Sequence, residues 1–196
     1  MKFGFARLLA ALALLGSLDG LATAQTGGAV PNTSATAAST APAADAGIEP
    51  LVLTGMLAAQ NDARKRIGVP ALKWSSDLAS RADAAAKTAG KGSCSINMAE
   101  RAAKAENGSY YWAAGMPRIA GSNVAQDISA SYLVSRWREG SADYDVAKGL
   151  CRTKSSSCDS YSRMVAPKAK FVGCARNTCS NQAQVWICLY SEQAAH

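Results

Sequence analysis

The chain has 196 residues, with 21 Lys and Arg against 14 Asp and Glu, six cysteines, one histidine and a formal net charge of +7. No recognition motif for nucleic acid accompanies this positive charge, so we exclude nucleic acid as a partner. The only histidine is His196, the last residue, and a terminal side chain is rarely held firmly enough to bind metal or to catalyse a reaction.

Residues 1–24 have the pattern of a secretory signal peptide. A basic start at Lys2 and Arg7 precedes the apolar run 8–15, and the small residues 22–24 suit cleavage before Gln25. The apolar run is shorter than the ~20 residues that span a bilayer, and no later stretch is apolar enough to do so. We therefore expect a secreted, extracellular protein with no transmembrane segment; the alternative is an uncleaved anchor.

Residues 25–50 consist almost wholly of Ala, Thr, Ser, Gly and Pro. Such a segment buries too little apolar surface to offset the entropy lost on ordering, so we predict a disordered stalk. Asn32 begins an Asn-Thr-Ser sequon and is a candidate glycosylation site, the alternative being an unmodified tether. The remainder, residues 51–196, has the length of one domain with a single core, which we expect to be monomeric.

Three helices are predicted in this domain. The first ends at Gly68 and places Gln60 on its apolar face, and the second runs from an N-cap at Ser76 to Gly90. The third begins at Asp127 and ends at Gly140, and the segment between the second and third helices is expected to be irregular. The side chains on the inner face of the first helix are Leu53, Met56, Leu57, Gln60, Arg64 and Ile67, and those of the third are Ala130, Leu133, Val134 and Trp137.

The C-terminal part changes from helical to strand periodicity. Residues 170–176 and 184–190 are rich in Val, Ile and aromatic side chains and are joined by a turn-like segment, which predicts a hairpin. The second of these strands is apolar on both faces, so it must be covered on both sides. Helices first and strands late, with a doubly covered sheet, predict an α+β fold in which the layers form a three-layer α-β-α sandwich.

The cysteines indicate a disulfide framework. An even number of cysteines downstream of a secretory leader is typical of paired cysteines, here in three disulfides. Spacing alone does not choose among the fifteen pairings that six cysteines allow. The six residues are Cys94, Cys151, Cys158, Cys174, Cys179 and Cys188.

In its motifs the chain resembles the CAP superfamily, which contains cysteine-rich secretory proteins, antigen-five allergens and plant pathogenesis-related class-one proteins. The resemblance runs from about residue 51 to residue 190, and it implies that Cys94 pairs with Cys179, Cys151 with Cys158 and Cys174 with Cys188. The motifs that carry it are Ala59-Gln-Asn-Asp-Ala-Arg-Lys-Arg-Ile-Gly-Val-Pro-Ala-Leu-Lys-Trp74, Leu78-Ala79, Glu106-Asn107, Tyr110-Tyr-Trp112, Trp137 with Tyr144, Val172-Gly-Cys-Ala175 and Ile187-Cys-Leu-Tyr190.

CAP domains usually have a cleft in which two histidines and two glutamates hold a divalent metal. The resemblance places Gln60 and Ser160 at the histidine positions, Ser160 within a strand, and Glu106 and Gly140 at the glutamate positions. A zinc site needs imidazole, thiolate or carboxylate ligands, so we expect no metal and no other cofactor. Gln60 and Ser160 are expected to satisfy each other by hydrogen bonds instead.

The residues at these four positions also argue against an enzyme. With neither an internal histidine nor a free cysteine, the usual arrangements of nucleophile, base and orienting residue are missing. A degenerate hydrolase that uses Ser160 and Glu106 is kept only as an alternative, because a lone glutamate activates serine poorly. We therefore predict no catalytic residue.

Two non-catalytic functions follow from the resemblance. Several CAP proteins bind sterols or fatty acids, and the counterpart of their aromatic loop here is Tyr110, Tyr111, Trp112 and Met116; the alternative is that these aromatics only cover the sheet. The second hypothesis is an extracellular interaction or effector protein that binds a protein or an anionic wall polysaccharide. Basic residues gather in the C-terminal half, where they either attract such a partner or form an ordinary solvated face. They are Lys148, Arg152, Lys154, Arg163, Lys168, Lys170 and Arg176.

Asn107 forms a second sequon, Asn107-Gly-Ser109, within the Glu-Asn motif. In CAP proteins this asparagine tends to be structural, so we expect a buried, unmodified side chain; glycosylation at the mouth of the cleft is the alternative.

Overall fold

The computed structural model describes residues 47–91, 94–114 and 128–193, all of which belong to one compact unit. The predicted signal peptide, the stalk up to residue 46 with Asn32, and Met116 lie outside these ranges.

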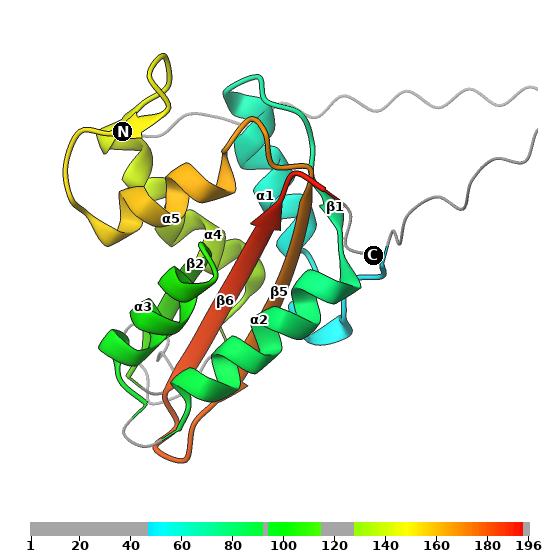
Figure 1. The fold of residues 1–196 in the computed structure, drawn as a ribbon, viewed down its shortest axis with the longest axis vertical. Helices are drawn as coiled ribbons and strands as arrows, with labels where there is room; N and C mark the ends of the chain where they lie inside the picture. The colour runs from blue at the N-terminus through cyan, green and yellow to red at the C-terminus, as the bar shows by residue number, and fades with distance from the viewer. Residues whose placement is uncertain (1–46, 92–93, 115–127, 194–196) are drawn as a thin grey trace, which may run out of the picture. The chain divides into compact units, whose positions relative to one another are not determined.

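A four-stranded sheet lies at the centre of the fold (Figure 1). Its strand order is β1 (Lys73–Trp74), β5 (Phe171–Thr178), β6 (Gln184–Ser191) and β2 (Ser109–Ala113). β1 pairs with β5 in parallel, and the other neighbours are antiparallel. The predicted C-terminal hairpin is confirmed as β5 and β6, which form the two central strands.

Helices cover both faces of this sheet. α2 (Ser76–Ala89) and α3 (Ile96–Ala105) pack on one face, and α1 (Met56–Arg66), α4 (Ala130–Arg138) and α5 (Ser156–Met164) pack on the other. Short 3₁₀ helices η1 (Leu51–Leu53) and η2 (Glu139–Asp143) and a two-stranded ladder of β3 (Tyr144–Asp145) and β4 (Leu150–Cys151) complete the fold. The predicted three-layer α-β-α sandwich is confirmed. Within the described ranges no helix combines the length and apolarity needed to cross a membrane.

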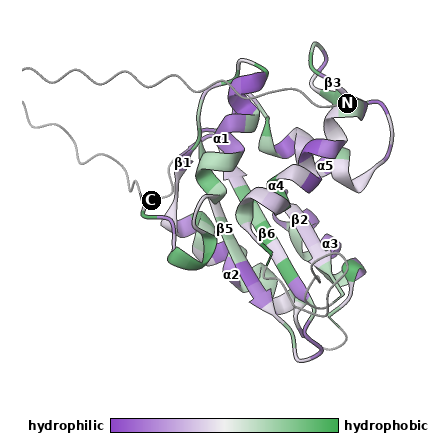
Figure 2. Ribbon diagram, turned by 180° about the vertical axis from the view of Figure 1, so that it is seen from behind, coloured by the Kyte–Doolittle hydropathy of each residue, from purple (hydrophilic) through white to green (hydrophobic). Residues whose placement is uncertain are grey.

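The core lies on both sides of β6. Trp186 and Cys188 pack against α1, α4 and α5, whereas Val185, Ile187 and Leu189 pack against α2 and α3. All five side chains are buried, and hydrophobic residues run along the strand in Figure 2. Burial of each large apolar side chain contributes about 1.5–3 kcal/mol, so this strand ties the two helical layers into one core.

Gly173 sets how closely α2 approaches the sheet. A β-carbon at this position would lie 2.1 Å from the backbone nitrogen of Ala79. Only a residue without a side chain permits this contact, and α2 presents small residues to the sheet on the same face. They are Ala82, Ala86 and Ala89.

Several predicted boundaries were wrong by a few residues. The N-cap of α2 is Ser75, whose side chain accepts from the Leu78 amide, rather than Ser76. α4 begins at Ala130 after its N-cap Ser129, and Gly140 lies within η2. The four predicted core residues of α4 are all buried, as expected.

The segment predicted to be irregular in fact contains α3 and β2. α3 buries only Ala99 and Ala103, but its apolar and polar side chains are well separated around the helix, so the sequence did carry a helical signal that the prediction missed. β2 has only five residues, and its pairing with β6 is what makes it a strand. Pairing with β6 therefore decides the structure of β2, whose short sequence has little local signal of its own.

The disulfides have the pairing that the family resemblance implied. Cys94–Cys179 closes the longest loop, with a sequence separation of 85. Cys151–Cys158 joins β4 to α5, and Cys174–Cys188 joins the paired strands β5 and β6. The disulfides therefore join β4 to α5, β5 to β6, and the segment after β5 to the segment before α3.

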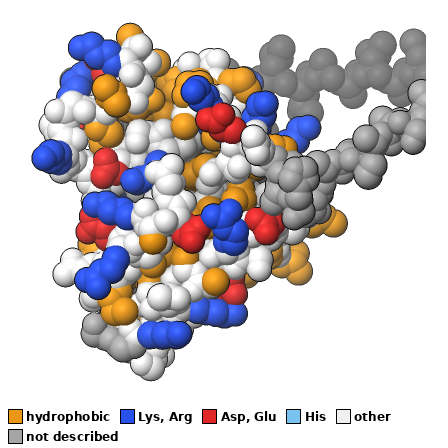
Figure 3. All heavy atoms as spheres, in the orientation of Figure 1, with side chains coloured by type: hydrophobic (Ala, Val, Ile, Leu, Met, Phe, Trp, Pro, Cys, Tyr) orange, Lys and Arg blue, Asp and Glu red, His pale blue; other side chains and the backbone are white. Residues whose placement is uncertain are grey.

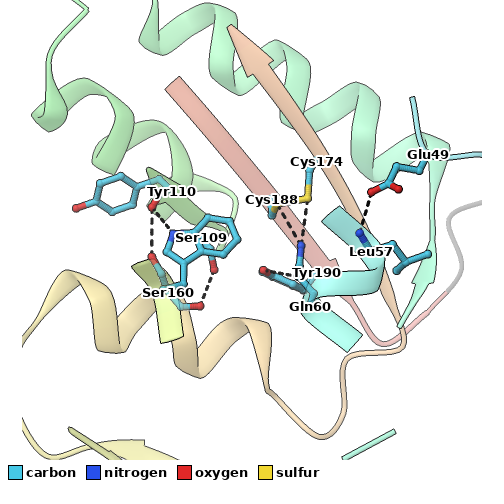
Figure 4. Close-up of a disulfide and its surroundings, with 10 residues drawn as sticks. Glu49, Leu57, Gln60, Ser109, Tyr110, Ser160, Cys174, Cys188 and Tyr190 are labelled. Carbon is cyan, nitrogen blue, oxygen red and sulfur yellow. Dashed lines mark hydrogen bonds between the residues drawn. A yellow bond between two sulfur atoms is a disulfide. The ribbon is translucent and has the colours of Figure 1, made fainter. Parts of the chain in front are cut away.

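The N-terminus of α1 is capped by a residue that precedes the helix in the chain. The Glu49 carboxylate accepts from the backbone amides of Gly55 (3.0 Å) and Leu57 (2.8 Å), as Figure 4 shows for Leu57. A carboxylate at this end of a helix satisfies free amides and interacts favourably with the helix dipole. Glu49 is thus held against the domain two residues before the predicted boundary at residue 51.

Candidate functional site

Gln60 is fully buried on the inner face of α1 (Figure 4). Its side-chain nitrogen lies 3.5 Å from both sulfur atoms of the Cys174–Cys188 disulfide, which are weak acceptors. Its side-chain oxygen accepts from the hydroxyl of Tyr190 at 3.0 Å. Both ends of the amide are therefore engaged by β5 and β6.

Tyr190 holds this contact as a neutral donor. Burial raises the pKa of Tyr190 well above the usual value for tyrosine, against smaller opposing effects from the Ser109 hydroxyl and from the charges of Arg64 and Arg163. Ionisation of the buried phenol is disfavoured because its anion would lose hydration. The site at Gln60 is thus neutral and hydrogen-bonded.

Ser160 lies on the helix α5, not on a strand as predicted. Its hydroxyl makes a long contact of 3.5 Å with the Tyr110 carbonyl, and its own carbonyl accepts from the Ser109 hydroxyl at 2.8 Å. The Trp137 indole donates to the same Tyr110 carbonyl at 2.8 Å. These bonds attach the edge strand β2 to α4 and α5.

Gln60 and Ser160 therefore do not satisfy each other, contrary to our expectation. Each has its own partners, and Tyr190 and Ser109 lie between the two groups (Figure 4). Both side chains have hydrogen-bond partners, but these partners are residues that were not predicted.

The two positions where the resemblance expects glutamate contact other elements of the fold. Glu106 forms an ion pair with Arg81 of α2 and lines a depression between α2 and α3, on the other face of the sheet. At Gly140 a β-carbon would lie 2.3 Å from the Ser157 carbonyl oxygen and 2.5 Å from the Cys158 amide nitrogen. The backbone of α5 consequently occupies the space that a side chain would need at this position.

These residues do not fit a zinc site. A glutamine amide already bound at both ends and a glycine packed against a helix supply none of the usual donors, and Glu106 is committed to Arg81. In the part of the chain that the structure describes, no three or more His, Cys, Asp or Glu residues are grouped closely enough to hold a metal.

Three of the four predicted lipid-contacting residues do meet at one cavity. Tyr110, Tyr111 and Trp112 lie on β2 rather than in a loop, and they line a cavity of about 300 Å³ at the outer edge of that strand, which we call the β2 pocket. Ile96 and Trp137 add apolar surface, whereas the remaining lining is polar. The polar lining residues are Arg136, Glu139, Ser156, Ser157 and Ser160.

The aromatic side chains of β2 are held in place by neighbours. Tyr111 and Tyr132 make an edge-to-face contact with ring centroids 6.3 Å apart, and burial, followed by a hydrogen bond to Tyr132, raises the pKa of Tyr111 to about 12. The Trp112 indole donates to the Cys94 carbonyl at 2.9 Å. Tyr110 belongs mostly to the core, whereas Tyr111 and Trp112 are partly exposed at the pocket.

A second cavity, of about 260 Å³, lies between the segment that follows α5 and the end of β6; we call it the α5–β6 pocket. Asn107 lines it and is exposed, which corrects our expectation of a buried side chain. Its backbone has φ = 52°, a left-handed conformation at the end of α3 that asparagine tolerates. Its side-chain oxygen accepts from the Arg163 Nε at 3.3 Å.

Arg64 is a buried residue whose importance the sequence did not reveal. Its guanidinium donates to four backbone carbonyls at 2.6–3.0 Å, and burial lowers its pKa. These bonds fix α1 to the segment between α5 and β5. In the sequence, Arg64 stood out only as a charged residue on the mostly apolar face of the predicted helix. The four acceptors are the carbonyls of Pro70, Met164, Ala166 and Ala169.

Comparison with known proteins gives a consistent result. The family model described as CAP, the cysteine-rich secretory protein family, matches residues 57–190. Pathogenesis-related leaf protein 4 of Solanum lycopersicum is 29% identical over 128 residues, which are 64% of this chain and 67% of that protein. The crystal structure of a hookworm platelet inhibitor superposes with a TM-score of 0.52 at 14% identity, over 76% of this chain and 73% of that one. A likeness at this identity supports the fold alone.

Proposed function

The chain belongs to the CAP family of cysteine-rich secretory proteins, and on that basis we propose that it is a secreted, extracellular, non-catalytic protein that binds a small lipid in the β2 pocket. The lipid class is a sterol or a fatty acid. The observation that carries the proposal is the convergence of Tyr111, Trp112 and Trp137 with Ile96 around one cavity of about 300 Å³.

The size and lining of the pocket narrow the choice of ligand. Small-molecule sites usually measure about 300–1,000 Å³ and combine apolar walls with a few polar groups that orient the ligand. The β2 pocket is at the lower end of that range and has hydroxyls and an Arg136–Glu139 pair at its polar side. It suits one end of a sterol or part of an acyl chain, with the polar head close to Ser156 and Ser157.

The arrangement of the polar residues supports a non-catalytic role. The Ser160 hydroxyl is buried and directed at a backbone carbonyl, and neither a histidine nor a carboxylate contacts it among the described residues. A serine nucleophile needs such a base. Glu106, the partner considered in the hydrolase alternative, is bound to Arg81 on the other face of the sheet.

A lipid-binding assay with rim variants tests the proposal. Ile96 lines the β2 pocket and is 46% exposed, so Ile96→Asp should place a charge at the rim without disturbing the core. Val146 is similarly exposed, at 59%, but lies outside the pocket, which makes Val146→Asp a matched control. We expect radiolabelled cholesterol or palmitate to bind the wild type and Val146→Asp. Binding to Ile96→Asp should be at least about tenfold weaker, which corresponds to a loss of about 1.4 kcal/mol in binding free energy.

Two results would contradict lipid binding. One is that neither lipid binds the wild type and that native mass spectrometry of the secreted protein shows no retained lipid. The other is equal loss of binding in Ile96→Asp and Val146→Asp, since the β2 pocket would then play no special part.

A second candidate function is recognition of an acidic extracellular partner. Lys148, Arg152, Lys154, Lys168 and Lys170 are all exposed in or near the β3–β4 and α5–β5 connections. Figure 3 shows Lys and Arg spread over one face of the molecule with carboxylates between them, so this face has no single concentrated basic patch. Binding to an anionic polysaccharide that disappears at high salt and persists in Ile96→Asp would favour this function over lipid binding.

A further inference from the structure

The α5–β6 pocket is positively charged. Arg163 and Lys168 line it, and Glu192 is the one carboxylate among its described lining residues. The lining therefore has a formal charge of about +1, which matches a ligand with a single negative charge better than a doubly charged phosphate.

Arg163 has a donor that the protein leaves unused. Its Nε donates to Asn107, but its Nη1 is buried and has no hydrogen-bond partner within the described ranges. A buried donor without an acceptor is costly and uncommon in folded proteins. Arg163 also lines the pocket, and the planar group of arginine suits a carboxylate particularly well.

The remaining walls suit a small carbon skeleton. Ala166, Pro167 and the ring of Tyr144 provide apolar surface, and Ser162 and Ser191 provide hydroxyls. A cavity of about 260 Å³ admits a molecule the size of a six-carbon acid more readily than a polymer chain or a whole lipid.

We propose that the α5–β6 pocket binds a small organic acid through its one carboxylate, with Arg163 and Lys168 supplying the charge. Ala166 and Pro167 contact the carbon skeleton of the acid. The acid is either a short aliphatic acid or a sugar acid, and both present the same carboxylate. This site is separate from the β2 pocket and does not depend on lipid binding there.

Calorimetric titration of the full secreted chain tests this site. The probes are hexanoate and glucuronate, each with a neutral counterpart, hexanamide and glucose. We expect at least one acid to bind at low salt and its neutral counterpart to bind at least tenfold more weakly. Preference for hexanoate identifies an aliphatic acid, and preference for glucuronate identifies a sugar acid.

Charge variants locate the binding. Arg163→Gln should weaken binding of the acid about tenfold and Lys168→Gln about threefold, in line with the loss of a charge-assisted hydrogen bond and of a more exposed charge. Lys87→Gln is the control. This substitution removes the same charge, but Lys87 lies on α2, in the opposite helical layer. Lys168 is exposed, so Lys168→Gln keeps the test valid even if Arg163→Gln fails to fold.

Three results would overturn the proposal. They are the absence of binding by both acids, equal binding of an acid and its neutral counterpart, and equal weakening by Lys168→Gln and Lys87→Gln. Displacement of a bound acid by equimolar inorganic phosphate would also contradict a site for monocarboxylates. In a parallel NMR titration, movement of the Trp112 indole signal instead of the Tyr190 and Ser191 amides would assign the acid to the β2 pocket and thus reject this site.

Discussion

The hydroxyl of Tyr190 donates to the side-chain oxygen of Gln60 across 3.0 Å, joining the last strand of the sheet to the first helix. Gln60 stands where CAP domains usually have a histidine, and this contact, with those to the Cys174–Cys188 disulfide, leaves its amide fully engaged. The contacts of Gln60 therefore tie α1 to β5 and β6.

The first prediction concerns alkaline pH. Burial raises the pKa of Tyr190 in the folded state above its unfolded value of about 10. The resulting stability is fully present below pH 10 and is lost as pH rises toward the folded-state pKa, because only the unfolded chain then releases the proton. Between pH 10 and 11 the free energy of unfolding should fall by about 1 kcal/mol more in the wild type than in Tyr190→Phe. Urea unfolding at several pH values measures this difference, and parallel curves for the two proteins would contradict it.

The second prediction is that zinc does not stabilise the protein. A ligand present at 100 times its dissociation constant would raise the free energy of unfolding by about 2.7 kcal/mol, which is several degrees in Tm. We expect the Tm to be the same with zinc chloride and with EDTA, because Gln60, Ser160 and Gly140 offer none of the usual zinc donors and Glu106 is paired with Arg81. A saturable rise in Tm at micromolar zinc would show that another set of residues binds the metal.

The third prediction concerns Gly140. A methyl group here meets the backbone of Ser157 and Cys158 at 2.3–2.5 Å, and backbone atoms cannot move aside as a flexible side chain can. Gly140→Ala should therefore destabilise the fold by about 2–4 kcal/mol. Ser141→Ala, at the next and exposed position of η2, should change stability by less than about 0.5 kcal/mol. Equal Tm values for the two variants would mean that α5 shifts easily away from η2.

The fourth prediction concerns Arg64. Replacement by methionine keeps much of the side-chain volume but leaves four carbonyls without their donor, and should cost about 3–5 kcal/mol of stability. Arg66→Met is the control, since the Arg66 side chain is 58% exposed and pairs with Asp62 on the same helix. We expect the control to change stability by about 0.5 kcal/mol or less. Chemical denaturation measures both, and a small effect of Arg64→Met would mean that water replaces the guanidinium.

The fifth prediction ranks the disulfides. In the chain-entropy model the Cys94–Cys179 bond, with a separation of 85, contributes about 4–5 kcal/mol, and the Cys151–Cys158 bond, with a separation of 7, about 2 kcal/mol. Replacing both cysteines of each pair by alanine should therefore lower the Tm more for Cys94 and Cys179. The reverse order would show that strain or residual structure in the unfolded chain outweighs loop length.

Local sequence patterns predicted the elements whose apolar side chains recur at a regular spacing. The helices α1, α2 and α4 and the hairpin of β5 and β6 follow from such patterns, because one apolar face per element is a property of neighbouring residues. α3 was missed although its apolar and polar side chains lie on separate faces of the helix, whereas β2 was missed because it depends on its pairing with β6.

The candidate site was predicted only in part. The family resemblance identified Gln60, Ser160, Glu106 and Gly140 by their order along the chain, but order gives no distances. In the structure Glu106 lies on the other face of the sheet from Gln60, and Gly140 lies against α5. By contrast, the three adjacent aromatics of β2 do line one cavity, since residues that are adjacent in sequence at an edge strand can reach the same space; their role in lipid binding stays a prediction.

By itself the sequence determined the layered fold and, through the absence of an internal histidine, the loss of the family's usual metal ligands. Only the tertiary structure decided which polar groups satisfy one another and where cavities remain. The reason is that these contacts join residues far apart in the chain, such as Gln60 with Tyr190 and Arg64 with Met164, 130 and 100 positions apart. Their distances depend on how helices pack on the sheet, which no local pattern of residues records.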